Sequence, residues 1–263
     1  MTFLPGLYDI HAHLADTRLQ VQRDSILKEC QNNLQGVLAN AAHISEWPDI
    51  IRLATQPGIY GALGCHPFFC REWHEYALPE LEQCIRTARA NGSKIIACGE
   101  IGLDFWNGRA DAGLQREILT RQLLLARQLA LPVILHNRKA WPDFFALLRE
   151  LRLDTLPGVC HHFNASREIA RLALDHGLFL SFCGPLTYPE ARRLHDLACY
   201  VPLDRLLLET DCPDLPPQSK RGRLSTPLDV AETTAFLAQL RGCTPELLAA
   251  QQARNWQALF PDC

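Results

Sequence analysis

The chain has 263 residues, of which 48% are hydrophobic and 21% are charged, so it can bury a large core. Its formal net charge of -3 excludes binding of nucleic acid through bulk basic charge, and any such contact must be local. No apolar stretch is long enough to span a bilayer, and residues 1–5 lack the charged and apolar regions of a signal peptide. We therefore expect a globular protein of the cytoplasm with no membrane attachment.

Eight short apolar runs alternate with helix-length segments along the chain. The runs cover residues 7–10, 36–39, 60–64, 95–98, 133–135, 158–160, 178–181 and 206–208. Apolar residues at three- and four-residue spacing predict amphipathic helices over 80–90, 114–130 and 229–240. Thr244 followed by Pro245 predicts the N-cap and first turn of a last helix that ends near Phe260.

Eight strands that alternate with helices predict a parallel sheet, and a closed (β/α)8 TIM barrel over residues 1–263 is the leading α/β architecture. A doubly wound open sheet is the alternative. The first run is followed by His11-Ala12-His13 and not by a glycine-rich phosphate loop, which weighs against that alternative. The loop over 213–227, rich in proline and charge, is expected to border the active site.

Cysteine usage indicates the compartment. The 11 cysteines include no Cys-x-x-Cys pair, and Cys98, Cys160 and Cys183 lie in or beside apolar runs. This pattern is typical of small buried core residues in a reducing compartment and not of a disulfide framework.

His11 and His13 follow the first apolar run directly. Alternate residues of a strand face the same side, so the two imidazoles should point together while Ala12 points away. Such a pair suits a divalent metal, and the alternative is one core histidine and one exposed histidine.

Polar residues follow nearly every expected strand. They are His11 and His13 after the first strand, His66 after the third, Glu100 and Asp104 after the fourth, His136 and Arg138 after the fifth, His161 after the sixth, and Glu209 and Asp211 after the eighth. Functional side chains of TIM barrels lie at the carboxyl ends of the strands, so these residues predict one shared site.

The metal-capable members of this set are His11, His13, Glu100, His136, His161 and Asp211. They exceed what one catalytic ion needs, so two divalent ions bridged by Glu100 fit better. His11, His13 and Asp211 would hold one ion, and His136 and His161 the other. Imidazole and carboxylate ligands suit Zn²⁺, Mn²⁺ or Fe²⁺, and Mg²⁺ when more oxygen and water take part.

The predicted chemistry is hydrolysis by an activated water. Asp211 would act as the general base and later return the proton to the leaving group. Glu209, two residues earlier, is expected on the same face, where it would assist catalysis or orient water. Arg138 and the loop residues Lys220, Arg221 and Arg223 would bind a phosphate group.

Six ordered motifs resemble the signature set of the TatD family of metal-dependent hydrolases, which are amidohydrolase-like TIM barrels. They are Asp9-Ile10-His11-Ala12-His13, Gly64-Cys65-His66-Pro67, Gly99-Glu100-Ile101-Gly102-Leu103-Asp104, residues 132–138, His161-His162-Phe163 and Leu208-Glu209-Thr210-Asp211-Cys212-Pro213. The resemblance implies a DNase that cleaves phosphodiesters with Mg²⁺ or Mn²⁺. It also implies the six metal ligands named above and a monomer with no obligate protein partner.

Substrate and competing functions stay open at this point. His66, Asp104, Arg138, Phe163 and Arg221 are the expected substrate-binding residues, whereas His162 should alternate away from His161 and pack against a helix. The first hypothesis is a DNase that acts on single-stranded ends. The second is hydrolysis of a small amide, ester or lactone at the same centre, and the third is a non-catalytic metal-binding protein.

Overall fold

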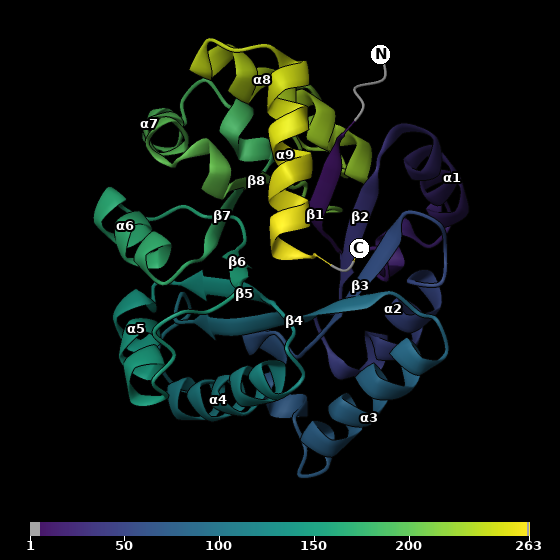
Figure 1. The fold of residues 1–263 in the computed structure, drawn as a ribbon, viewed down its shortest axis with the longest axis vertical. Helices are drawn as coiled ribbons and strands as arrows, with labels where there is room; N and C mark the ends of the chain where they lie inside the picture. The colour runs from purple at the N-terminus through teal and green to yellow at the C-terminus, as the bar shows by residue number, and fades with distance from the viewer. Residues whose placement is uncertain (1–5, 262) are drawn as a thin grey trace.

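The computed structural model describes residues 6–261 and 263. Eight parallel strands follow one another in chain order around a barrel surrounded by helices (Figure 1). The strands are β1 (Tyr8–Ala12), β2 (Gly36–Asn40), β3 (Ile59–Leu63), β4 (Ile95–Asp104), β5 (Val133–Arg138), β6 (Gly158–Cys160), β7 (Phe179–Phe182) and β8 (Leu206–Leu208). Strictly sequential order confirms the predicted TIM barrel, because a doubly wound sheet changes direction from its first strand.

Nine α-helices lie within the described residues. They are α1 (Arg23–Asn33), α2 (Trp47–Leu53), α3 (Ala77–Ala90), α4 (Ala112–Gln128), α5 (Trp141–Glu150), α6 (Arg167–Asp175), α7 (Arg192–Tyr200), α8 (Val230–Arg241) and α9 (Pro245–Leu259). The predicted last helix begins as expected, because the Thr244 side chain accepts a hydrogen bond from the Leu247 amide.

β1 and β8 close the barrel just beyond the end of β8. The Asp211 amide donates to the His11 carbonyl oxygen at 2.9 Å, and the His13 amide donates to the Cys212 carbonyl oxygen at 2.8 Å. An isolated parallel bridge pairs Ala12 with Cys212 between these two bonds. The first and last strands therefore meet at the residues predicted to hold a metal.

The amino-terminal half of the barrel interior is filled by apolar side chains. Each strand contributes one buried residue, namely Ile10, Leu38, Ala62, Ala97, Ile134, Val159, Phe179 and Leu207. Trp256 and Leu259 of α9, with Phe260, pack against this layer, and Figure 1 shows α9 in yellow across the middle of the barrel. Polar functional side chains are therefore expected at the opposite end of the barrel, where the strands have their carboxyl ends.

Two further expectations concern compartment and membrane. Cys98, Cys160 and Cys183 are buried thiols, as predicted for core residues. No helix in the described part of the chain is both long and apolar enough to cross a bilayer. The expectation that the chain has no signal peptide rests on residues 1–5, which lie outside the described residues.

Candidate metal centre

Two strands carry an irregularity at the residues that enter the site. The β1–β2 register shifts between Asp9 and Ala12, and the β4–β5 register shifts between Cys98 and Ile101. An extra residue in a strand changes which side chains face inward, and such bulges are frequent beside active sites. The shifts allow Ile10 and Ala97 to fill the core while His11 and Glu100 reach the centre.

Glu100 is the middle of the site. Its Oε2 lies 3.3 Å from His11 Nε2 and 3.4 Å from His13 Nε2. Its Oε1 lies 2.7 Å from His161 Nε2 and 3.1 Å from His136 Nδ1. The two carboxylate oxygens therefore face two separate histidine pairs.

Asp211 completes the first of these groups. Its Oδ1 lies 3.6 Å from His11 Nε2 and 3.4 Å from His13 Nε2. The Asp211 backbone is left-handed, with φ of 58°, a conformation that is uncommon outside glycine and is concentrated at functional sites. This turn brings the carboxylate to the rim, where it is 14% exposed while His11 is fully buried.

The donor chemistry fits divalent metal ions. The Nε2 atoms of His11 and His13 approach to 3.2 Å, as do His136 Nδ1 and His161 Nε2. Neutral imidazole lone pairs converge in this way when a cation lies between them. The structure groups His11, His13 and Asp211, then His11, Glu100 and His161, then His66, Glu100 and His136 as atoms close enough to share an ion.

The electrostatics point the same way. Burial would raise the pKa of Glu100, but His161 and the other imidazoles hold it well below its usual range, and Asp211 is lowered in the same manner by His13. Burial lowers the pKa of His66 to about 3 and also lowers that of His11. By contrast, and against the effect of burial, Asp211 and Glu100 raise the pKa of His13 to about 9, and Glu100 also helps to raise those of His136 and His161. Ionised carboxylates and neutral imidazoles are the forms that bind metals, so an ion at this centre would displace protons from these three imidazoles.

Three carboxylates hold the site residues in place. Asp104 Oδ2 lies 2.8 Å from His136 Nε2. Glu209 is fully buried, where it accepts hydrogen bonds from Ser181 Oγ at 2.6 Å and the His162 amide at 2.5 Å. Asp9 accepts hydrogen bonds from the His11 amide and from both the amide and hydroxyl of Thr210, so it acts as a structural acceptor.

His66 lies closer to the centre than its predicted substrate role required. Its Nε2 is 3.4 Å from Glu100 Oε1, while its Nδ1 accepts a hydrogen bond from the Phe68 amide at the start of the 3-10 helix η3 (Pro67–Glu72). The ring is therefore oriented by the backbone so that Nε2 faces the carboxylate. Its position after β3 was the signal in the sequence, but only the structure brings it to Glu100.

The other three residues expected to bind substrate differ in their exposure and in their contacts. Arg138 is exposed at the rim, with its guanidinium 3.9 Å from the centre of the Trp106 ring. Phe163 is 1% exposed and packs edge-on against Trp141, so it lies in the packing under α5 and not on the open surface. Arg221 pairs with Glu190 at 2.6 Å.

His162 differs from the expectation that it packs against a helix as part of a continuing strand. β6 ends at Cys160, and His162 has φ of 43°, so strand alternation does not extend to it. Its ring instead lies tilted beside His161, with centroids 6.4 Å apart. Sequence reasoning missed Phe68 and Trp106, which are large exposed aromatics beside this site.

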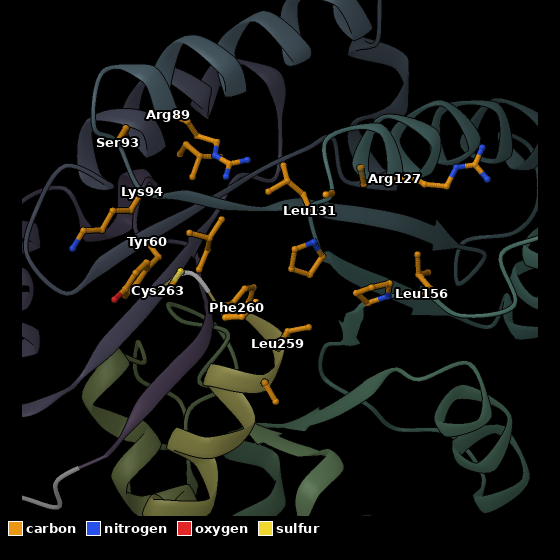
Figure 2. Close-up of a pocket in the computed structure, with 18 of the residues that line it drawn as sticks. Tyr60, Arg89, Ser93, Lys94, Arg127, Leu131, Leu156, Leu259, Phe260 and Cys263 are labelled. Carbon is orange, nitrogen blue, oxygen red and sulfur yellow. The ribbon is translucent and has the colours of Figure 1, made fainter.

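A cavity of about 790 Å³ lies at the other end of the barrel. Figure 2 shows Tyr60, Leu131, Leu259 and Phe260 around it, near the starts of the strands and the end of α9. Among the described residues that line it there is no histidine, aspartate or glutamate. This cavity therefore lacks the groups for hydrolysis, which the carboxyl end supplies.

A TIM barrel with a histidine–carboxylate centre at its carboxyl end defines a metal-dependent hydrolase. A family model described as "TatD related DNase" matches residues 8–261, and the chain belongs to that family.

Relatives support this assignment along the whole chain. The "Uncharacterized metal-dependent hydrolase YabD" of Bacillus subtilis is 30% identical over 258 residues, which cover 97% of this chain and 98% of that protein. The "3'-5' ssDNA/RNA exonuclease TatD" of Erwinia billingiae is 34% identical over 265 residues, covering 97% and 98%. The crystal structure of the TatD homolog YjjV from Escherichia coli superposes with a TM-score of 0.89 at 30% identity, covering 99% and 100% of the two chains.

Proposed function

We propose that this protein uses two divalent metal ions to hydrolyse phosphodiester bonds at the ends of single-stranded nucleic acid. DNA is the proposed main substrate. The division of the Glu100 carboxylate between two histidine pairs is the observation that carries the proposal. A bridging carboxylate of this kind suits a two-ion centre for phosphoryl chemistry. The exonuclease named among the relatives supports the choice of substrate.

The residues divide into ligands and supports. His11, His13 and Asp211 would hold one ion, and His136 with His161 the other, with Glu100 between them and His66 beside the second group. When bound, such ions acidify water and neutralise charge on the phosphodiester. Mg²⁺, Mn²⁺ and Zn²⁺ all remain compatible with these ligands.

Asp211 is the proposed general base. Contact with His13 keeps its pKa well below the usual range, so the carboxylate is ionised at neutral pH, which is the form a general base needs before the reaction. It takes the proton from water as the new P–O bond forms, and returns it to the oxygen of the P–O bond that breaks. Its partial exposure at the rim, beside the partly exposed His13, places it where substrate arrives.

Glu209 is the proposed positioning residue of the second group. Its hydrogen bonds with Ser181 and the His162 amide, and its Oε1 at 3.8 Å from His161 Nδ1, fix the segment that presents His161. His161 Nδ1 is buried and forms no hydrogen bond in the structure, so Glu209 would act on His161 through the backbone segment and through charge.

The test is hydrolysis of an end-labelled single-stranded oligonucleotide by metal-stripped protein after addition of Mg²⁺, Mn²⁺ or Zn²⁺. The test variant is Glu100→Ala, and the matched control is Glu117→Ala on the outer helix α4, where Glu117 pairs with Arg121. We expect metal-dependent cleavage that Glu100→Ala abolishes and Glu117→Ala retains. If metal still binds but no metal supports cleavage, the nuclease proposal is wrong, and a small amide, ester or lactone becomes the expected substrate.

We further propose that the protein acts as a monomer in the cytoplasm. The buried, unpaired thiols of Cys98, Cys160 and Cys183 support a reducing compartment. All the candidate ligands come from one chain, so the site requires no residue from a partner.

A further inference from the structure

Two large aromatic side chains are exposed beside the metal centre. Phe68 is 54% exposed and Trp106 is 51% exposed. The Phe68 ring packs edge-on against His66, with centroids 4.7 Å apart, and lies 6.0 Å from the His136 ring. Exposed apolar surface that borders a functional site is a candidate for ligand binding.

Trp106 is tied to the metal centre through the backbone. Its amide donates to Asp104 Oδ1 at 2.8 Å, and the other oxygen of the same carboxylate holds His136. Asp104 and Arg138 are register partners at the ends of β4 and β5, and the Phe105 amide donates to the Arg138 carbonyl oxygen. The backbone of Trp106, in the turn after β4, is therefore anchored to the carboxylate that also holds His136.

Two consecutive cations lie over the indole. Arg138 Cζ is 3.9 Å and Lys139 Nζ is 4.0 Å from the ring centre. Lys139 has φ of 55°, a left-handed backbone conformation that is uncommon outside glycine. Neither cation forms an ion pair within the part of the chain that the structure describes.

We infer that Phe68, Trp106, Arg138 and Lys139 form a platform that binds single-stranded nucleic acid by stacking its bases and pairing with its phosphates. A base stacked on an aromatic ring contributes more binding free energy than an exposed cation–π contact. An arriving base therefore displaces a cation from Trp106, and the released cation pairs with a neighbouring phosphate. Bases of a duplex are already stacked and paired, so the platform selects single strands.

This inference deepens the proposed function and rests on it, but its test does not need catalysis. The probes are fluorescein-labelled decathymidylate and an abasic deoxyribose-phosphate oligomer of the same length and charge. Their binding is measured by fluorescence anisotropy with metal-free protein in EDTA, so that no cleavage occurs. The abasic probe retains the phosphates and lacks only the groups that stack.

Wild type should bind decathymidylate more tightly than the abasic probe. Trp106→Ala should weaken decathymidylate binding by about 10-fold and change abasic binding by less than about twofold, whereas Trp106→Phe should retain most of the preference. Phe68→Ala should act in the same direction. Lys139→Ala should weaken both probes equally and reduce the salt dependence by about one phosphate contact.

Tyr200→Ala on α7 is the matched control, because Tyr200 is 40% exposed with Arg167 lying over its ring, away from the centre. It should leave both affinities unchanged. Equal losses on both probes for Trp106→Ala, or none on either, would overturn the platform.

The two proposals fail in distinguishable ways. Wild type that prefers the base-bearing probe but cleaves no oligonucleotide with any metal would refute the nuclease and retain the platform. Wild type that cleaves, with unaltered base preference in Trp106→Ala, would retain the nuclease and refute the platform.

Discussion

Asp104 and His136 form a pair that connects the metal centre to its surroundings. Asp104 Oδ2 lies 2.8 Å from His136 Nε2, which leaves Nδ1 of the same ring 3.1 Å from Glu100. A histidine held at one nitrogen by a carboxylate presents the other nitrogen in a defined direction. The structure thus shows Asp104 orienting His136, a proposed ligand, whereas the sequence predicted a role for Asp104 in substrate binding.

Asp104→Asn should therefore weaken metal binding without removing a ligand. Loss of such a supporting carboxylate typically lowers metal affinity by about 10- to 100-fold. Isothermal titration of metal-free protein with Zn²⁺ or Mn²⁺ measures this affinity. Asp154→Asn, at the exposed Asp154, is the control. An unchanged affinity in Asp104→Asn would show that His136 needs no such support.

The position of His66 makes a stoichiometric prediction. Because His66 Nε2 and His136 Nδ1 share Glu100 Oε1, His66→Ala should impair the second ion and spare the first. Metal analysis after gel filtration should then give about one ion per chain against about two for wild type. His74→Ala, which removes an exposed histidine paired with Glu80, should retain both. If His66→Ala keeps the full metal content, His66 is not a metal ligand, and only its predicted role in substrate binding is left.

Arg138 and Arg221 should behave differently although both were expected to bind substrate. Arg138 forms no salt bridge among the described residues, although its charge helps to lower the pKa of Asp104, whereas Arg221 pairs with Glu190 and lies over the Tyr188 ring. Arg138→Ala should weaken binding of a single-stranded oligonucleotide and reduce its salt slope by about one. Arg221→Ala should change both little. Anisotropy titrations at several salt concentrations compare the two, and equal effects would contradict this distinction.

Alkaline pH should destabilise the fold through buried thiols. Burial raises the pKa of Cys30 to about 12, above the ordinary value of about 8.5. Between these values the folded chain retains a proton that the unfolded chain has lost. The free energy of unfolding therefore falls as pH rises, by about 1.4 kcal/mol per pH unit for this thiol.

Urea unfolding of wild type and Cys30→Ala between about pH 9 and about pH 10.5 tests this slope. The variant should lose stability less steeply with pH, whatever its stability at neutral pH. Cys199→Ala, at an exposed position on α7, should retain the wild-type slope. Parallel slopes for Cys30→Ala and wild type would contradict the assignment.

Apolar runs predicted the barrel well because a parallel sheet buries both faces of its strands. The runs at 158–160 and 206–208 coincide with β6 and β8. The run at 95–98 stopped short of β4, which extends to Asp104 through residues that are partly polar or glycine. Pairing with β5, including Asp104 with Arg138, supplies the backbone bonds that this segment's composition did not suggest.

The sequence predicted which residues come together at the site, but it predicted the orientation of their side chains less well. Asp211 and Glu209 are two apart, which in a regular strand places them on one side. β8 ends at Leu208 and Asp211 is left-handed, so the alternation does not reach them. Exposure of Phe68 and Trp106 depends on tertiary packing, and no periodicity in the chain indicates it.

Closure of the barrel has a consequence for the order of events during synthesis. His11 and His13 emerge from the ribosome first, whereas Asp211, whose amide bonds to the His11 carbonyl oxygen, emerges nearly two hundred residues later. A nascent chain that lacks β8 has neither the seam nor the carboxylate that completes the first ligand group. If Asp211 is a metal ligand as proposed, hydrolytic competence would therefore arise only after the segment that follows β8 is in place.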